Sequence, residues 1–310
     1  MGIIRLRFSS KNTNSLQRLN VRTFKGRAGQ SYNEFCEWFV GFVDGDGTFT
    51  IDRLNNGTKW NLVLKVDQNA RNSQVLNYIK TSLGVGNISK PASGNWCFRI
   101  RSRAVLKSII FPIFDAYPLI TVKYFDYMLV KEAYDVLESG ISREEINCKM
   151  EQIYSRLVKG PQKGLKSVVW SNVVNENALT RKDIGFISMA WLIGFWEADG
   201  SFYITRKDKA NRLAHAVGLS QKEDRIVLEA IRLIFRADAK VRDRRPTKEC
   251  FIWESTSKAI HGRVIEIFDG KLVGRASLRF SIWKKSLNYT DSKLIKARDL
   301  LRKLSPRNID

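Results

Sequence analysis

Histidine and paired cysteine are scarce in this chain. Only two histidines, His215 and His261, occur among its 310 residues. A catalytic triad centred on histidine, or a metal site built from several histidines, is therefore nearly excluded. The four cysteines stand singly, with no Cys-x-x-Cys pair, which argues against a zinc ribbon and a thioredoxin-like site. We interpret them as small buried apolar residues in a reducing compartment.

Acidic residues and long apolar runs are also scarce. Lys and Arg number 53 against 31 Asp and Glu, so the formal net charge is +22. No apolar stretch is long enough to span a bilayer, and the basic residues are spread over both halves rather than along one amphipathic membrane helix. The hydrophobic fraction of 44% argues against disorder. These features predict a folded protein with no membrane role and a nucleic acid partner.

The first thirty residues contain many Arg and Lys, and no acid precedes Glu34. This pattern is typical of an Arg-rich transit peptide. It is equally typical of a flexible basic arm that lies on phosphate. Both interpretations stay open, and we treat residues 1–30 as a basic N-terminal arm.

Two stretches of the chain repeat one arrangement of acids and glycines. The sequence reads GFVDGDGTFTI at 41–51 and GFWEADGSFYI at 194–204. Asp46 and Asp199 are 153 positions apart, and so are Gln68 and Gln221. This period is too long for a solenoid. It indicates two similar domains fused in one chain, with approximate two-fold symmetry.

Each motif is followed by the same order of expected elements, which is two β-like runs, an amphipathic helix and two more β-like runs. Apolar and polar residues alternate along the runs, so each sheet has one buried and one polar face. We predict an α+β fold in which helices, such as those expected at 74–83 and 103–115, cover one face of each antiparallel sheet. The predicted domains span 31–158 and 182–310, and 159–181 reads as a linker.

The segment before each motif acid reads as a buried helix. Apolar residues cover nearly every side of it in both copies, and such a helix lies in an interior or an interface. Both copies also carry small residues four positions apart, as Gly41 and Gly45 are in the first. We therefore expect the two motif helices to approach closely and form the seam between the domains.

Packing of the motif helices would bring Asp46 and Asp199 together. Two close carboxylates repel and shift each other's pKa unless a cation lies between them, and hard divalent cations prefer oxygen ligands. The alternative is that these acids, with Asp44 and Glu197, only form turns after the helices. Two copies in register, in a strongly basic chain, favour a divalent metal site.

The segments FVGFVDGDG (39–47) and LIGFWEADG (192–200) resemble the two motifs of the LAGLIDADG homing endonucleases, in the single-chain form. The similarity covers about 31–290 and includes the motif pair, the period and the strand pattern. The family contains enzymes that cut long DNA sites and maturases that help their own intron RNA to splice. The resemblance implies an intron-encoded, mitochondrial protein, or alternatively a chloroplast one, that acts as a monomer on double-stranded DNA.

The resemblance also implies a metal site. The acid before the last motif glycine binds the metals in the family, and these are two or three Mg²⁺ ions that Ca²⁺ or Mn²⁺ can replace. Asp44 and Glu197 match the other motif acid, whose role is structural. Metals would activate water and stabilise the leaving oxygen, with cleavage across the minor groove and short 3′ overhangs. The implied metal-site residues are Asp46, Asp199, Gly45 and Ala198.

The two halves differ at one implied catalytic position. YPLITVKYFDY is similar to the family segment with a catalytic lysine, which maps to Lys123 and would offset charge developing at the phosphate. The second half reads KLVGRASLRF and has Ala276 there, where Arg275 or Arg279 would substitute. The glutamines of the repeat match polar residues that order water. The candidate catalytic residues are Asp46, Asp199, Gln68, Gln221, Lys123 and Arg275.

The polar sheet faces would lie in the major groove, where base edges are distinguishable, and the remaining Lys and Arg would contact phosphate. Each outward strand residue is alternatively only solvated. The candidates for DNA contact are Thr48, Thr50, Asp52, Asn61, Lys65, Asn87, Arg99 and Arg101 in the first half, and Ser201, Tyr203, Thr205, Lys240, Arg242 and Arg244 in the second.

Two other functions stay open beside a metal-dependent, sequence-specific DNA endonuclease. An RNA maturase that assists group I intron splicing, with or without nuclease activity, fits the replacement at Ala276, whereas the intact acids favour the nuclease. A DNA-binding regulator on an inactive nuclease scaffold also fits the fold, but neighbouring carboxylates are costly without a metal.

Overall fold

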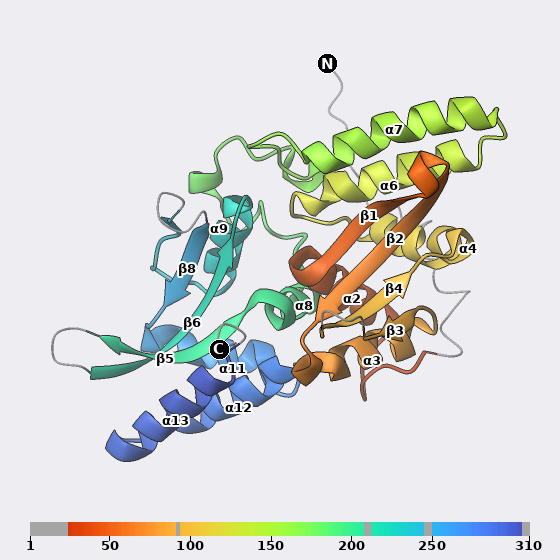
Figure 1. Cartoon of the computed structure of the whole chain (residues 1–310). Helices are drawn as coiled ribbons and strands as arrows, with labels where there is room; N and C mark the ends of the chain where they lie inside the picture. The colour runs from red at the N-terminus through yellow and green to blue at the C-terminus, as the bar shows by residue number, and fades with distance from the viewer. Residues whose placement is uncertain (1–23, 91–93, 208–211, 245–249, 306–310) are drawn as a thin grey trace.

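The computed structural model describes residues 24–90, 94–207, 212–244 and 250–305. Two halves with the same order of elements lie on either side of a central helix pair (Figure 1). The first half contains α2 (Tyr32–Asp46), β1 (Gly47–Leu54), β2 (Lys59–Gln68), α3 (Ser73–Leu83), β3 (Asn87–Ser89), β4 (Trp96–Ile100), α4 (Arg103–Val105), a π-helical turn (Leu106–Ile110), α5 (Phe111–Ala116), α6 (Lys123–Leu137) and α7 (Arg143–Lys159). The second half contains α8 (Met189–Asp199), β5 (Ser201–Lys207), β6 (Arg212–Gln221), α9 (Arg225–Ile234), β7 (Arg242–Asp243), β8 (Phe251–Ser255), α11 (His261–Phe268), α12 (Arg275–Ser286) and α13 (Asp291–Lys303).

Each half has a four-stranded antiparallel sheet. The strand orders are β1-β2-β4-β3 and β5-β6-β8-β7, so the two sheets have the same topology. This confirms the predicted α+β fold with two similar sheets. Of the two β-like runs expected after the amphipathic helix of the second half, the first forms only the two-residue strand β7.

Helices cover one face of each sheet, as the alternation of apolar residues predicts. In the first half, Phe49 of β1 packs edge-on against Phe114 of α5, with ring centroids 5.0 Å apart. In the second half, Phe202 of β5 packs against Phe268 of α11 and Phe280 of α12. The helix expected at 103–115 forms as α4, the π-helical turn and α5 in succession. The opposite sheet faces carry the polar residues.

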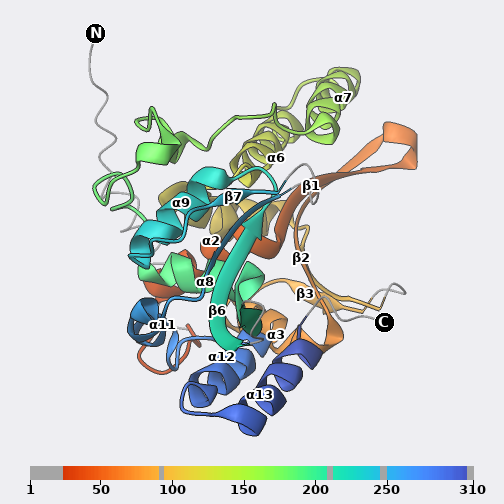
Figure 2. The same cartoon turned by 90° about the vertical axis from the view of Figure 1, so that its left-hand side faces the viewer.

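The two motif helices form the seam, as predicted. Figures 1 and 2 show α2 and α8 side by side between the two halves. A Cβ atom at Gly41 would lie 2.1 Å from the carbonyl oxygen of Trp191, and one at Gly194 would lie 1.9 Å from that of Trp38. The helix backbones therefore touch at positions where only glycine fits. Ser31 starts α2 with a capping box.

The segment between α7 and α8 contains two short 3₁₀ turns, Val168–Trp170 and Glu176–Ala178. Trp170 is buried, and its Nε1 donates to the carbonyl of Ile120 at 2.8 Å. The connection therefore packs onto the first half at Trp170, beside the loop before α6. The domain and linker boundaries stay predictions.

Most of the predicted N-terminal arm lies outside the described residues. At its described end, the ring of Phe24 packs against Tyr32 and Phe35 of α2. Within the described ranges, no helix has the length and apolar character needed to cross a membrane.

Candidate active site at the helix seam

The seam brings the predicted metal-site residues together at one end. α2 ends at Asp46 and α8 ends at Asp199, and both helices run to the same end of the seam. A Cβ atom at Gly45 would lie 2.4 Å from the Cβ of Ala198 and 3.3 Å from Oδ2 of Asp199. The small residues at these two positions therefore let the acids approach from both helices.

Burial and mutual repulsion perturb the two carboxylates. Burial, and then the charge of Asp199, raises the pKa of Asp46 from 3.8 to about 7. Burial likewise raises the pKa of Asp199. In the described part of the chain no group of three or more His, Cys, Asp or Glu is placed to hold a metal. A cation here would therefore take two carboxylates and backbone carbonyl oxygens, which is a ligand set suited to a hard divalent ion.

A glutamine holds each carboxylate in place. Gln68 Nε2 donates to Asp46 Oδ2 at 2.5 Å, and Gln221 Nε2 donates to Asp199 Oδ2 at 2.6 Å. Each glutamine ends the second strand of its sheet. The equal spacing of the two glutamines in the sequence therefore corresponds to the same glutamine–aspartate hydrogen bond in each half.

Lys123 starts α6 and reaches the C-terminal end of α2. Its Nζ donates to the carbonyls of Val43, at 3.2 Å, and of Gly45. Its charge lowers the pKa of Asp46 and that of Asp199, against the effect of burial. The ammonium group therefore lies beside both acids.

Asp44 lies two residues before Asp46 and has a structural role. It is 1% exposed and accepts hydrogen bonds from the backbone amides of Ile120 and Thr121, both at 3.1 Å. Trp191 Nε1, on the opposite motif helix, donates to it at 2.8 Å. The side chain thus ties the loop before α6 to both seam helices.

Glu197 makes the equivalent contacts in the second half. It accepts from the backbone amides of Val273, at 2.7 Å, and of the next residue, at 2.9 Å. Ala276 follows this loop at the place where Lys123 follows the loop that binds Asp44. The structure therefore places alanine at the position equivalent to the lysine.

Two residues that sequence reasoning missed link the halves across the seam. Asn72 Oδ1 accepts from the backbone amide of Arg275 at 2.8 Å, and Asp224 Oδ1 accepts from that of Val122 at 2.9 Å. Asn72 Nδ2 also donates to Gln68 Oε1 at 2.6 Å. Both residues are N-caps of helices, α3 and α9. The sequence signal for these contacts was a polar residue three or four positions after each glutamine, at the start of the following helix.

Arg275 lies at this contact between the halves, since its backbone amide binds Asn72. Burial, and then the charge of Arg71, lowers the pKa of Arg275. Its backbone, rather than its guanidinium, makes the contact with the first half.

The candidates for DNA contact in the first half lie on the polar sheet face. Four of the candidates pair in register and form one row across all four strands, and Asp52 pairs with Asn61 further along β1 and β2. Arg101 follows β4, and its guanidinium lies 3.6 Å from the Asp52 carboxylate. Thr50 pairs with the buried Val63. The row consists of Thr48, Lys65, Arg99 and Asn87.

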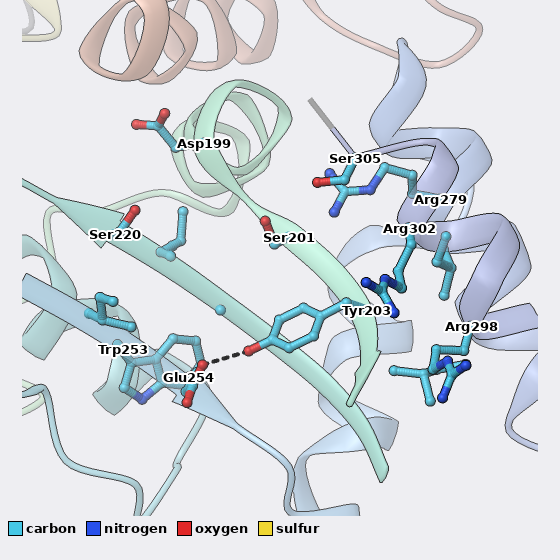
Figure 3. A pocket seen from close by; sticks show the side chains of 15 residues that line it. Asp199, Ser201, Tyr203, Ser220, Trp253, Glu254, Arg279, Arg298, Arg302 and Ser305 are labelled. Atoms are coloured by element: carbon cyan, nitrogen blue, oxygen red, sulfur yellow. Dashed lines mark hydrogen bonds between the residues drawn. The ribbon is translucent and has the colours of Figure 1, made fainter. Parts of the chain in front are cut away.

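In the second half, Ser201, Tyr203 and Thr205 alternate with buried residues along β5. Tyr203 Oη donates to Glu254 Oε2 at 2.7 Å, as Figure 3 shows, and Arg242 pairs with the other oxygen of Glu254. Glu254 is a further polar residue of this face that sequence reasoning missed. Lys240 and Arg244 flank the short strand β7 rather than lie in it.

Comparisons with known proteins agree with this geometry. The family described as LAGLIDADG endonuclease matches residues 39–134 and 192–287. The "probable intron-encoded endonuclease Cox1-I1b" of Schizosaccharomyces pombe is 38% identical over 295 residues, which cover 92% of this chain and 72% of that protein.

Solved structures of similar fold include I-LtrWI, a LAGLIDADG homing endonuclease bound to target DNA, with a TM-score of 0.70 and 20% identity over 89% of this chain and 100% of that one. I-SmaMI, bound to uncleaved DNA target in the presence of calcium ions, has a TM-score of 0.66 and 23% identity over 87% of this chain and 94% of that one. The family match covers the C-terminal parts of both motif helices, both sheets and the loops that bind Asp44 and Glu197. The chain therefore belongs to the LAGLIDADG endonuclease family, in the single-chain form with two motifs.

Proposed function

We propose that this protein is an intron-encoded homing endonuclease that hydrolyses one phosphodiester bond in each strand of a specific DNA duplex and leaves short 3′ overhangs. The observation that carries the proposal is the pair of Asp46 and Asp199 at the same end of the seam, each bonded to an equivalent glutamine. A net charge of +22 supports a polyanionic substrate.

The oxygen donors at the seam fit Mg²⁺. Asp46 and Asp199, with the backbone carbonyls of Gly45 and Ala198, would hold two or three such ions, and Ca²⁺ or Mn²⁺ would substitute. Lys123 Nζ donates to the Gly45 carbonyl, so it would move from that oxygen when an ion binds there. A bound divalent ion lowers the pKa of water and stabilises a leaving oxygen. The calcium ions in the I-SmaMI complex support divalent metal use.

The surrounding side chains have separate tasks in this proposal. Gln68 and Gln221 fix the orientation of the two carboxylates through their amide groups. Lys123, held by carbonyls at the end of α2, would offset negative charge that develops on the phosphate.

The polar sheet faces would read the DNA bases in the major groove. The row of Thr48, Lys65, Arg99 and Asn87 supports this, because it spans the whole width of one sheet. We propose that the protein acts as a monomer, since one chain already supplies both halves. We place it in the mitochondrion, with the chloroplast as the alternative, and the support is the intron-encoded relative.

A cleavage screen tests the proposal. Purified protein is incubated with Mg²⁺ and a randomised duplex library, and the products are sequenced for double-strand breaks. We expect breaks at one related set of sites, with 3′ overhangs, that disappear with EDTA and with Asp46→Asn. Binding to duplex DNA without any breaks would contradict the nuclease.

A maturase function is the second candidate, and Ala276 is the observation that favours it. Loss of one catalytic lysine weakens a nuclease site but leaves other basic surfaces intact. A splicing assay on the host intron RNA tests this: acceleration that survives Asp46→Asn would establish a role separate from cleavage, and no acceleration would refute it.

A further inference from the structure

A pocket of about 310 Å³ opens beside Asp199 on the polar side of the second sheet (Figure 3). Asp199, Ser201 and Ser220 line it from the end of α8 and from strands β5 and β6. Three arginines that sequence reasoning did not bring together line the other side. They are Arg279 of α12 and Arg298 and Arg302 of α13.

A glycine in the central strand gives the pocket its room. Gly218 of β6 pairs with Ser201 on one side and with Glu254 on the other. A Cβ atom at Gly218 would lie 2.9 Å from the carbonyl oxygen of Trp253. No side chain therefore projects from β6 at this point of the polar face, and the Tyr203 side chain crosses β6 to bind Glu254.

Arg279 lies one helical turn after Ala276, the position equivalent to Lys123. Helical side chains lean toward the N-terminus of their helix, which here is the end nearest the loop that binds Glu197. Arg279 is 7% exposed, and its Nη2 donates to the carbonyl of Phe202 at 3.4 Å. The guanidinium is thus held at the second residue of β5, three positions after Asp199. Arg275 is not among the residues that line the pocket.

Arginines outnumber carboxylates among the residues that line the pocket. Its three arginines face two carboxylates, and Glu254 is already engaged by Tyr203 and by Arg242. Asp299 holds Arg298 through two contacts to one oxygen, at 2.9 and 2.8 Å. Guanidinium groups in fixed positions match phosphate oxygens in geometry and charge.

We propose that Arg279, Arg298 and Arg302 bind the DNA backbone phosphates next to the second cleavage site. In this inference, which rests on the proposed endonuclease function, Arg279 supplies from one turn further along α12 the positive charge that Ala276 lacks. The second half therefore positions its strand with a guanidinium cluster, and the first half uses one lysine.

Strand-specific cleavage tests the inference. The duplex found by the cleavage screen is labelled differently on each strand, and single-turnover rates are measured for both strands. Lys123→Met should slow cleavage of one strand by about 10²-fold, and Arg279→Met should slow cleavage of the other strand by at least about 10-fold. The strand that stays uncut in the nicked product should therefore differ between the two variants. Arg279→Lys should restore part of the rate. Lys285→Met, which removes an exposed charge from the same helix, should leave both rates within about twofold.

The Arg298→Gln/Arg302→Gln double variant keeps the buried Arg279 and tests the pocket if Arg279→Met lowers the melting temperature. We expect this variant to bind DNA more weakly, and the plot of log K against log salt to be shallower by the amount that about two phosphate contacts contribute. It should also cleave the strand affected by Arg279→Met more slowly. The inference is overturned if Arg279→Met slows both strands equally, if Arg275→Met alone gives the strand-specific defect, or if the double variant binds as the wild type does. Wild-type protein that cuts neither strand would instead refute the proposed function and the inference with it.

Discussion

Replacing Asp46 with asparagine should stabilise the metal-free protein while it abolishes cleavage. Burial and the neighbouring Asp199 raise the pKa of Asp46 from 3.8 to about 7. One pKa unit corresponds to 1.36 kcal/mol, so ionised Asp46 costs the folded state roughly 4 kcal/mol. Water at this partly exposed carboxylate screens some of the cost, and we expect Asp46→Asn to add about 2–4 kcal/mol to the free energy of unfolding.

The pH dependence of this gain has a definite sign. In the unfolded chain an aspartate ionises near pH 4, and in the folded protein Asp46 ionises near pH 7. Between these values the folded state binds more protons, so wild-type stability falls as the pH rises from about 4 to 7. Asparagine does not titrate. The gain from Asp46→Asn should therefore be largest above pH 7 and vanish below about pH 4.

Urea unfolding in EDTA, at several pH values from 5 to 8, measures the gain. Asp135→Asn, an exposed aspartate on α6, is the matched control and should change little. Mg²⁺ should then stabilise the wild type, by about 2.7 kcal/mol at a concentration 100-fold above its Kd, and should not stabilise Asp46→Asn. An Asp46→Asn protein that is less stable than wild type at pH 8 in EDTA would refute the account of two repelling carboxylates.

Three further results are expected. Lys123→Met should slow cleavage of one strand by about 10²-fold, the order seen for lost electrostatic stabilisers, and a time course on supercoiled plasmid should show nicked DNA before linear DNA; equal slowing of both strands would contradict this. Gly194→Ala would place a Cβ 1.9 Å from the carbonyl of Trp38 and should cost at least about 1–3 kcal/mol in urea unfolding, whereas Gly262→Ala, with open space around it, should cost little. DNA affinity should fall linearly on a plot of log K against log salt, with a slope of about −0.9 per phosphate contact, and a flat plot would exclude a backbone-dominated interface.

The seam and the sheets were predictable because their signals are local and doubled. Alternation of apolar and polar residues along β1 predicts which face of the strand, the one with Phe49, is buried. Glycines four positions apart in an all-apolar helix indicate that its backbone approaches that of another helix closely. The repeat of Gln68 and Gln221 at one spacing predicted two equivalent positions, and the structure shows the equivalent hydrogen bonds. Each of these inferences needs only neighbouring residues or the period.

The contacts across the seam were not predictable in the same way. Asn72 reads as an ordinary helix cap, and its bond to the amide of Arg275 depends on how two distant segments are placed. The pocket arginines depend on the position of α13 against β5, which no local pattern encodes. Choosing between Arg275 and Arg279 likewise required the direction of each side chain.

The way the halves are joined has a consequence for recombination. The side chains that tie them, Asn72 and Asp224, both bind backbone amides of the other half, which every residue except proline provides. The helix contact at Gly41 and Gly194 is also backbone against backbone. These contacts ask for no particular side chain in return, whereas the hydrogen bond from Trp191 Nε1 to Asp44 does. A gene fusion that joins this first half to the second half of a relative with tryptophan at the position of Trp191 should therefore give a hybrid with an intact seam, and new pairs of half-sites become accessible by exchange of whole halves.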